Sequence, residues 1–257
     1  LDCSNLTSIT LPEGVTSIRD WAFSGCSSLT SITLPEGVTS IGVSAFYNCT
    51  ALKKVIIEDG STTLSLGYNY YYSSGTVQGL FYDCPLEEVY LGRNLSYSSG
   101  SSYGYSPFYK SNRFPTISLG NNVTSIPSYL FYNNTSLTSI TLPESVTSIG
   151  NYAFYGCSSL YEVINNSNLL LSKGSSSNGY VAYYAKVVYQ GGELPTVGDY
   201  QFYTSNGIHS LVNYIGNDTE IVLPDSYNGE NYKIGNYAFL DCSNLTSITL
   251  PEGVTSI

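Results

Sequence analysis

Hydrophobic residues recur along this chain at fixed offsets within a unit of 23 residues. The frame reads Leu-x-x-Ile-x-Leu-Pro-x-x-Val-x-x-Ile-x-x-x-Ala-Phe-x-x-Cys-x-x, and Cys3, Cys26 and Cys49 mark its period. A complete copy covers residues 29–49 and recurs at 137–157. A fixed period of roughly 20 to 50 residues is the sequence signature of a solenoid, in which each unit stacks on the next.

Degenerate copies of the frame lie between the two complete ones, and a further copy resumes near the end of the chain. Their frame positions are held by Leu86, Val89, Leu91, Leu95 and Phe108, then by Phe114, Ile117, Leu119, Val123, Ile126, Phe131 and Asn134, and last by Ile221, Leu223, Pro224, Ile234, Ala238, Phe239 and Cys242. The repeat therefore extends over most of the 257 residues.

The frame predicts two short strands and a closing turn in every unit. Alternating apolar positions in LTSITLP are typical of a strand that buries one face, and the proline ends the strand because it cannot donate to a ladder. The β-branched VTSI segment predicts a second short strand or extended turn, and the phenylalanine of Ala-Phe fills the interior. No stretch has the length and period of a long helix. We therefore expect an all-β-rich solenoid, with a parallel β-sheet on one face and short strands and 3₁₀ turns on the other.

These residues resemble a known family. LPEGVTSIG followed by AFYNC is similar to the BspA-like leucine-rich repeats, also called the Treponema pallidum type, whose unit is this 23-residue frame with its Ala-Phe and Cys positions. The resemblance implies a secreted or surface-exposed protein, bacterial or from a protozoan parasite, that binds other proteins or host surfaces and is not an enzyme. It implies no particular ligand, because the residues that define the frame are buried ones.

Two insertions interrupt the frame at the same point of adjacent repeats. One lies between Leu64, which we assign to the second isoleucine position, and Leu80–Phe81, near residues 65–79; the other precedes Pro107–Phe108, near 96–106. Because adjacent repeats stack, the insertions should emerge side by side and bring tyrosines diluted with Ser and Gly to one edge, as in antibody binding loops. The candidate ligand-binding residues are Tyr68, Tyr70, Tyr71, Tyr72, Tyr97, Tyr103 and Tyr105. The alternative is that these tyrosines pack back on the solenoid.

The longest departure from the frame lies at residues 165–217. YVAYYAKVVYQ and GIHSLVNYIG are rich in β-branched and aromatic residues at strand length, and GGELPTVGDY between them is rich in turn-forming residues. This pattern predicts a small β-hairpin or meander, either a specificity module or a splice between two runs of repeats. The domain layout is then leucine-rich repeats over 1–164, the insert over 165–217 and resumed repeats over 218–257.

The two ends of the chain carry the same string, LDCSNLTSITLPEGVTSI, at residues 1–18 and 240–257. Both ends stop within a repeat and lack the polar cap that a finished solenoid needs. The sequence also contains no methionine. We therefore expect a piece of a longer array.

Composition restricts the classes of partner. With 19 Asp and Glu against 9 Lys and Arg, the net charge of −10 would repel a phosphate backbone, so nucleic acid is a poor ligand. No apolar run reaches the roughly 18 residues of a membrane helix, so we expect no membrane span in this chain. Protein and carbohydrate remain as ligand classes.

No arrangement of residues predicts catalysis, a cofactor or a metal centre. His209 is the only histidine and lies in the alternating GIHSLV segment, where a surface or half-buried strand histidine is the ordinary interpretation. No Gly-rich phosphate loop or paired-cysteine metal spacing occurs. Calcium needs about six or more oxygen ligands, and the frame supplies one carboxylate per repeat, after the strand-ending proline. These carboxylates belong to Glu13, Glu36, Glu144 and Glu252.

The cysteines all hold one position of the frame, which predicts a buried column of free thiols rather than a metal cluster. They are Cys3, Cys26, Cys49, Cys84, Cys157 and Cys242. On the exposed face of the predicted sheet, Lys53 and Lys54 of one repeat precede Glu87 and Glu88 of the next. Neighbouring strands would bring these charges together as cross-strand ion pairs.

We therefore expect a non-enzymatic extracellular protein-binding or adhesion module of a cell-surface leucine-rich repeat protein. Its partner would be a host or extracellular-matrix protein, contacted through the Tyr-rich insertions and the solenoid face. Two alternatives remain open: a carbohydrate-binding surface module, since tyrosine rings stack on sugars, and a structural spacer that displays another domain.

Overall fold

The computed structural model divides the chain into two compact units, residues 1–191 (unit 1) and 192–257 (unit 2). The structure describes residues 3–67, 70–71, 77–97, 106–109, 111, 113–190, 194–205, 207–235, 238–239 and 242–257. Within these residues the only helical element is the 3₁₀ turn η2 (Asn178–Tyr180), and none is long and apolar enough to cross a membrane.

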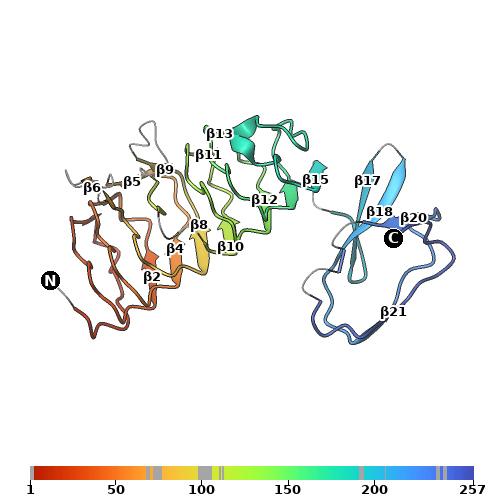
Figure 1. The fold of residues 1–257 in the computed structure, drawn as a ribbon, viewed down its shortest axis with the longest axis horizontal. Coiled ribbons are helices and arrows are strands. Elements are labelled where there is room, and N and C mark those ends of the chain that lie inside the picture. The colour runs from red at the N-terminus through yellow and green to blue at the C-terminus, as the bar shows by residue number, and fades with distance from the viewer. Residues whose placement is uncertain are drawn as a thin grey trace. The chain divides into compact units, whose positions relative to one another are not determined.

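Along one side of the unit 1 solenoid, successive coils contribute parallel strands, which pair into a four-stranded and a three-stranded sheet and are together called the main sheet (Figure 1). The strands are β2 (Ser31–Leu34), β4 (Lys54–Ile57), β8 (Glu88–Leu91), β10 (Thr116–Leu119), β12 (Ser139–Leu142), β14 (Glu162–Asn165) and β15 (Val187–Gln190). Side chains alternate along each strand; in β2, Ile32 and Leu34 are buried while Ser31 and Thr33 are exposed. The strand ends before Pro35, which has no N–H to donate. The predicted parallel leucine-rich repeat sheet is confirmed.

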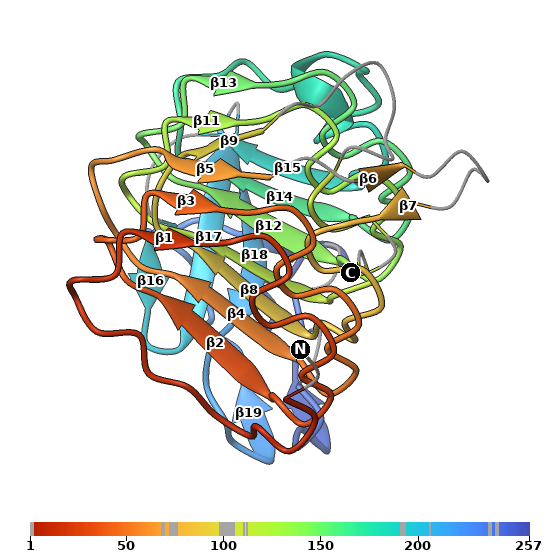
Figure 2. The ribbon, with the colours of Figure 1, turned by 90° about the vertical axis from the view of Figure 1, so that its left-hand side faces the viewer.

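A second row of short parallel strands completes each coil, and the two rows are seen together in Figure 2. Its strands are β1 (Ser17–Ile18), β3 (Ser40–Ile41), β5 (Leu64–Leu66), β9 (Leu95–Ser96), β11 (Ser125–Ile126) and β13 (Ser148–Ile149). The chain approaches the preceding coil closely after these strands. A Cβ on Gly150 would lie 2.4 Å from the backbone nitrogen of Ser128, so only glycine fits there. The second strand predicted from VTSI is confirmed.

The third side of each coil is closed by the Ala-Phe segment, whose rings form a continuous column. The column contains Phe23, Phe46, Phe81, Phe108, Phe131 and Phe154, with centroids of successive rings 5.2 to 6.4 Å apart. From Phe46 onwards each ring is at most 1% exposed. The predicted inward placement of these rings is confirmed, and each ring is buried by those of its neighbouring coils.

The cysteine position is a column of hydrogen-bond donors. The thiols of Cys49, Cys84 and Cys157 donate to the backbone oxygen of the column phenylalanine one coil earlier, with S···O distances of 3.1 to 3.2 Å. In two other coils Ser111 and Asn134 hold the same position; Ser111 donates to the backbone oxygen of Phe81 in the same way, and Asn134 donates to the backbone oxygen of Phe114, which lies outside the column. All six cysteines are free thiols; Cys26, Cys49, Cys84 and Cys157 are buried, Cys242 is partly buried and Cys3 is exposed.

The register of the second strands corrects one assignment made from the sequence. Ile41 pairs with Leu66, so Leu66 and not Leu64 holds the second isoleucine position. Leu64 pairs with Leu95, and the same register gives that position in the next coil to Tyr97, two residues after Leu95. The first insertion therefore begins after Leu66, and the second begins after Tyr97.

Arg93 is a buried charge that connects two coils. Its side chain is 1% exposed and donates hydrogen bonds to the backbone oxygens of Pro35, Glu36 and Val38 at 2.7 to 2.9 Å. It also donates to the Thr62 hydroxyl at 3.1 Å. Burial lowers the pKa of the guanidinium, against the attraction of nearby carboxylates. Within this bend the Val38 backbone N–H donates to the Pro35 oxygen at 3.0 Å, and Arg93 supplies further donors to the same segment.

Residues 165–217 are divided between the two units. Val187–Gln190 (β15) lies parallel to β14 in the main sheet of unit 1, and residues 180–186 lead into it from η2. An antiparallel meander does form, but its strands are β16 (Thr196–Val197), β17 (Tyr200–Ser205) and β18 (Ile208–Tyr214), all in unit 2. The stretch YVAYYAKVVYQ therefore belongs to the solenoid and not to the projecting meander expected from the sequence.

Unit 2 joins this meander to the resumed repeats. β18 pairs in parallel with β20 (Tyr232–Ile234), and β19 (Glu220–Val222) pairs in parallel with β21 (Ser247–Thr249). His209 lies half-buried in β18, with Nδ1 2.7 Å from the Thr204 hydroxyl and Nε2 3.2 Å from a Glu230 carboxylate oxygen. The predicted half-buried strand histidine is confirmed.

Candidate binding surface

A row of aromatic side chains runs along one edge of unit 1, on the turns that flank the phenylalanine column. In five coils the residue after the column phenylalanine is tyrosine. In two of these coils the residue two positions before the phenylalanine is also tyrosine. We call these side chains, together with those of the η2 region, the tyrosine edge. Its members are Tyr47, Tyr82, Tyr109, Tyr132 and Tyr155 in the first row, Tyr129, Tyr152 and Tyr180 in the second, and Tyr183 and Tyr184 at the end.

In both rows, rings of neighbouring coils form stacked pairs. Tyr152 lies between Tyr129 and Tyr180, at centroid distances of 5.3 and 5.5 Å and interplanar angles of 19° and 18°. Tyr132 and Tyr155 stack in the same manner at 5.3 Å. The spacing follows from the solenoid, because each coil sets the next about 4.8 Å away along the sheet.

The two rows are inclined to each other. Tyr155 meets Tyr152 at 75° and Tyr180 at 85°, both edge-to-face contacts. Because the row neighbours cover both faces of the Tyr152 ring, that ring presents its edge to the outside. Tyr152 is 41% exposed, Tyr155 37% and Tyr183 44%. At Tyr152 the surface therefore offers a ring edge rather than an open ring face.

The backbone of the second row is strained. Tyr129, Tyr152 and Tyr180 have φ values of +63°, +57° and +68°, a region that bulky L-residues rarely adopt. Trp21 and Ser44 have φ values of +61° and +53° in other coils, so the turn requires this conformation whatever side chain it carries. Strain of this kind costs on the order of 1 to 3 kcal/mol per residue and clusters at functional sites. The backbone conformation therefore does not favour tyrosine at these positions, and the ring contacts of the side chain do.

The tyrosine edge carries no formal charge in its most exposed part. Residues 127–136, 150–160 and 174–185 contain no Asp, Glu, Lys or Arg, although the chain as a whole has a net charge of −10. Binding at this surface would depend on contact area and hydrogen bonds. Charge steering would contribute little.

The Tyr-rich insertions leave the solenoid on the same turns. The first insertion leaves the coil after Gly67, and the chain rejoins the coil at Leu80. In later coils of unit 1 this part of the coil holds the second-row tyrosine. Its described residues form an antiparallel pair, β6 (Tyr70–Tyr71) with β7 (Val77–Gln78). The structure thus places the backbone of Tyr70 and Tyr71. The other four loop candidates, Tyr68, Tyr72, Tyr103 and Tyr105, lie outside the described residues.

Tyr97, the remaining sequence candidate, lies within the coil. Its hydroxyl donates a 2.7 Å hydrogen bond to the backbone oxygen of Ser128, and its ring packs against the core. Burial raises the pKa of this phenol. Tyr97 packs inward because it holds the second isoleucine position of its coil. For this residue the structure shows the alternative stated above, in which an insertion tyrosine packs back on the solenoid.

The exposed face of the main sheet carries charges that are paired with one another. Lys53 and Glu87 form an ion pair at 2.7 Å, and Lys54 and Glu88 form another at 2.8 Å. The predicted cross-strand pairs are confirmed. Both pairs are solvent-exposed, so each contributes roughly 0 to 1 kcal/mol to stability. The face offers a ligand balanced charges rather than an excess of either sign.

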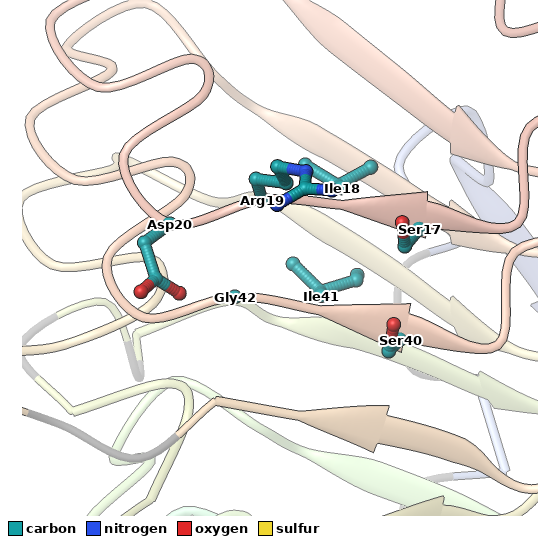
Figure 3. A pocket seen from close by; sticks show the side chains of 7 residues that line it. All are labelled: Ser17, Ile18, Arg19, Asp20, Ser40, Ile41 and Gly42. Atoms are coloured by element: carbon teal, nitrogen blue, oxygen red, sulfur yellow. The ribbon is translucent and has the colours of Figure 1, made fainter.

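A shallow hollow lies between β1 and β3 (Figure 3). It is lined by Ser17, Ile18, Arg19, Asp20, Ser40, Ile41 and Gly42. One Asp20 carboxylate oxygen already accepts a 2.7 Å hydrogen bond from the Val43 backbone nitrogen, so this carboxylate is part of the turn. The lining shows no group placed for chemistry on a ligand.

The described residues include no group of three or more His, Cys, Asp or Glu side chains that could hold a metal ion. Burial raises the pKa of the Cys157 thiol to about 12. Such a thiol is protonated near neutral pH and is not an activated nucleophile. Among the described residues, the tyrosine edge is the candidate binding surface.

The comparisons with known proteins agree with the fold. The chain matches the family model described as BspA type Leucine rich repeat region, with six copies over residues 1–78, 76–209 and 213–257. No curated protein matches the chain.

Three solved structures are similar to this chain. One is a leucine-rich cell surface protein from Faecalibacterium prausnitzii, with 25% identity, a TM-score of 0.33, and 95% of this chain and 60% of that chain covered. Another is a leucine-rich repeat protein from Bacteroides ovatus, with 20% identity, a TM-score of 0.44, and coverage of 99% and 63%. The leucine-rich repeat protein of T. pallidum has 23% identity, a TM-score of 0.34, and coverage of 70% and 64%. In each case the match spans less than two thirds of the other protein.

Proposed function

Because the chain belongs to the BspA-type leucine-rich repeat family, we propose that it is a non-enzymatic protein-binding or adhesion module of an extracellular, cell-surface protein. Its ligand is a host or extracellular-matrix protein. The ligand contacts the tyrosine edge and the Tyr-rich insertion loops that share its turns, with the solenoid face as a second surface. The observation that carries this proposal is the exposed double row of stacked tyrosines along unit 1.

Stacked tyrosines suit a protein ligand for energetic reasons. Tyrosine is enriched at protein interfaces because it buries a large area at a low cost in side-chain entropy, and its hydroxyl can still hydrogen-bond. At the tyrosine edge the neighbouring rings hold one another in place, with Tyr152 stacked on both sides. Less side-chain freedom is then lost on binding, which favours affinity.

Carbohydrate is the competing ligand class, and the ring geometry favours it less. A sugar stacks on the open face of an aromatic ring. The faces of Tyr152 are covered by Tyr129 and Tyr180, and Tyr155 is stacked on Tyr132. Ring edges and hydroxyls suit peptide groups and protein side chains better than they suit a sugar ring.

A substitution set tests the proposal. The purified chain is screened on an extracellular-matrix protein panel and, in parallel, on a glycan array. Two variants are compared on every ligand found, one with Tyr70, Tyr71, Tyr72, Tyr103 and Tyr105 changed to Ser and one with Tyr152→Ser and Tyr155→Ser. We expect protein binding to be lost or weakened at least about tenfold, which is about 1.4 kcal/mol, while thermal unfolding stays cooperative.

Val197→Ser/Ile208→Ser is the control, because these side chains are exposed in unit 2 and contribute to neither proposed surface. Tyr90→Ser probes the main sheet face, because Tyr90 lies on that face and its hydroxyl bonds to Asp59 rather than to the edge. Loss of binding in Tyr90→Ser alone would move the site to the sheet face. If the chain bound only on the glycan array, the ligand would be a carbohydrate and not a protein. A chain that binds neither array would support the spacer hypothesis and contradict the proposal.

A further inference from the structure

We propose that the tyrosine edge also binds the tyrosine edge of a second copy of this chain, so that two molecules associate side by side through one self-complementary contact. This inference goes beyond the proposed function, whose ligand is a different protein. It rests on the repeat spacing, the charge and the exposed area of the described tyrosines in unit 1.

The spacing of the rows selects a partner with the same period. Successive rings in the second row lie 5.3 and 5.5 Å apart because each comes from a successive coil. A partner with another period would lose register after a few coils. A second copy has an identical rise in every coil, so contacts made at one coil recur at the next without accumulating mismatch.

The hydroxyls at the edge are chemically self-complementary. A phenol both donates and accepts a hydrogen bond, so a row of phenols can pair with a like row. In a two-fold contact residue i of one molecule meets residue j of the other, and j meets i. Both faces of the Tyr152 ring are covered by its row neighbours, so this ring can meet a second row only through its edge.

Charge restricts self-association to this surface. The chain carries a net charge of −10, so two copies repel each other over most orientations. The segments 127–136, 150–160 and 174–185 are free of charged residues. Contact through them keeps the acidic groups of the two copies away from the interface.

The exposed area sets the strength of the contact. A tyrosine side chain can bury roughly 150 to 250 Å², and Tyr152, Tyr155 and Tyr183 are 41%, 37% and 44% exposed. Each then contributes on the order of 60 to 100 Å², and the three together offer less than the about 800 Å² per partner of a stable interface. We therefore expect weak, concentration-dependent association that gains strength when many copies are displayed on one surface.

Sedimentation velocity over a wide concentration range tests the inference without any other protein present. We expect a monomer–dimer equilibrium with a dissociation constant of roughly 10 µM to 1 mM, insensitive to salt or strengthened by it, because salt screens the repulsion. The variant Tyr152→Ser/Tyr155→Ser/Tyr183→Ser should raise that constant at least about tenfold. Val197→Ser/Ile208→Ser is the control, since it removes side chains that are 47% and 56% exposed in unit 2; it should associate like the parent.

A charge exchange separates a direct contact from a loss of folding. Tyr152→Lys/Tyr155→Lys and Tyr152→Glu/Tyr155→Glu should each be monomeric, because like charges face one another across the two-fold axis. An equimolar mixture should associate again. If the substitutions acted only by damaging the fold, association would not recover when the two variants are mixed.

A measurement on the unsubstituted chain covers the case in which these variants fail to fold. Photo-oxidative cross-linking of mixed ¹⁴N and ¹⁵N chains should give dityrosine peptides of mixed isotope composition from residues 150–160 and 174–185. A chain that stays monomeric at about 1 mM, or mixed peptides that come only from elsewhere, would overturn the inference. Self-association with no binding on the matrix panel would contradict only the proposed function, and the reverse result only this inference.

Discussion

The backbone oxygen of Phe131 accepts a hydrogen bond from the thiol of Cys157, 26 residues later in the chain and one coil further along the solenoid, at 3.2 Å. Cys49 has the same relationship to Phe23. Ser111 replaces the thiol as donor to the Phe81 oxygen, and Asn134, at the same position of another coil, donates to the Phe114 oxygen. The position therefore selects a small side chain with a hydrogen to donate, and cysteine is one solution among three.

Cys157 provides a test of that interpretation. Cys157→Ala leaves the Phe131 oxygen without this donor, and we expect a loss of about 0.5 to 1.5 kcal/mol in the free energy of unfolding. Cys157→Ser keeps a donor, as Ser111 does naturally, and should lose less. Urea denaturation of both variants measures the difference, and equal stability of the two would show that the thiol contributes only packing.

Buried thiols also predict a dependence of stability on pH. Burial raises the pKa of Cys157 from 9.0 to about 12, so folding favours its protonated form. For an acid of this kind the contribution to stability is full below pH 9 and is lost as pH rises from 9 to about 12, where the unfolded chain ionises first. We expect the unfolding temperature to fall in that window. The decrease should be smaller in Cys157→Ser, whose hydroxyl does not titrate, and an identical decrease in both proteins would rule out this thiol as a contributor.

Arg93 is expected to be the polar residue of unit 1 with the largest effect on stability. Arg93→Met would remove the side-chain donor to the backbone oxygens of Glu36 and Val38 and one of the two donors to the Pro35 oxygen, which also accepts from the Val38 backbone N–H; a buried unsatisfied group costs about 1 to 3 kcal/mol. We expect a total loss of about 2 to 5 kcal/mol. Arg93→Lys should recover only part of it, because an ammonium cannot reproduce the fork of the guanidinium. Wild-type stability in both variants, measured by denaturant unfolding, would contradict the role assigned to these hydrogen bonds.

The phenylalanine column gives a prediction for the apolar core. Phe154 is fully buried, and its ring centroid lies 5.2 Å from that of Phe131. Phe154→Ala should cost about 3 to 5 kcal/mol, as truncation of buried aromatic residues generally does. Because each coil contacts only its neighbours, the loss should appear in hydrogen exchange as reduced protection around β12 and β14. Protection that falls evenly across unit 1 would indicate a more cooperative solenoid than this reasoning assumes.

Tyr97 separates stability from binding. Tyr97→Phe removes the hydroxyl that donates to Ser128 and keeps the ring in the core. We expect a loss of about 1 kcal/mol in the free energy of unfolding, with binding to any matrix ligand unchanged. Loss of ligand binding at full stability would return Tyr97 to the set of contact residues.

The position of Tyr97 could not be read from the sequence for a specific reason. The coils that follow β3 contain insertions, so counting from one phenylalanine to the next no longer gives the register. Leu64 and Leu66 are both leucines on one side of a strand, and only the pairing of Leu66 with Ile41 decides which one holds the isoleucine position. That decision also sets the place of Tyr97.

The tyrosine edge did leave a signal in the sequence. Tyr47, Tyr82, Tyr109, Tyr132 and Tyr155 each follow a column phenylalanine. In a repeat frame these are spacer positions, where a single tyrosine has no special meaning. Their stacking becomes evident only when coils that lie 23 to 35 residues apart in the chain, such as those of Tyr132 and Tyr155 or of Tyr47 and Tyr82, are placed on one another.

The sequence by itself determined the solenoid, the two strand rows, the inward phenylalanines and the buried cysteine position. It could do so because burial in a stack of similar coils forces the same residue types to recur at the same offsets. The tertiary structure decided the register around the insertions, the reach of Arg93 across two coils and the tyrosine surface. These depend on contacts between residues far apart in the chain at positions that the repeat leaves free, and a periodic pattern carries no information about them.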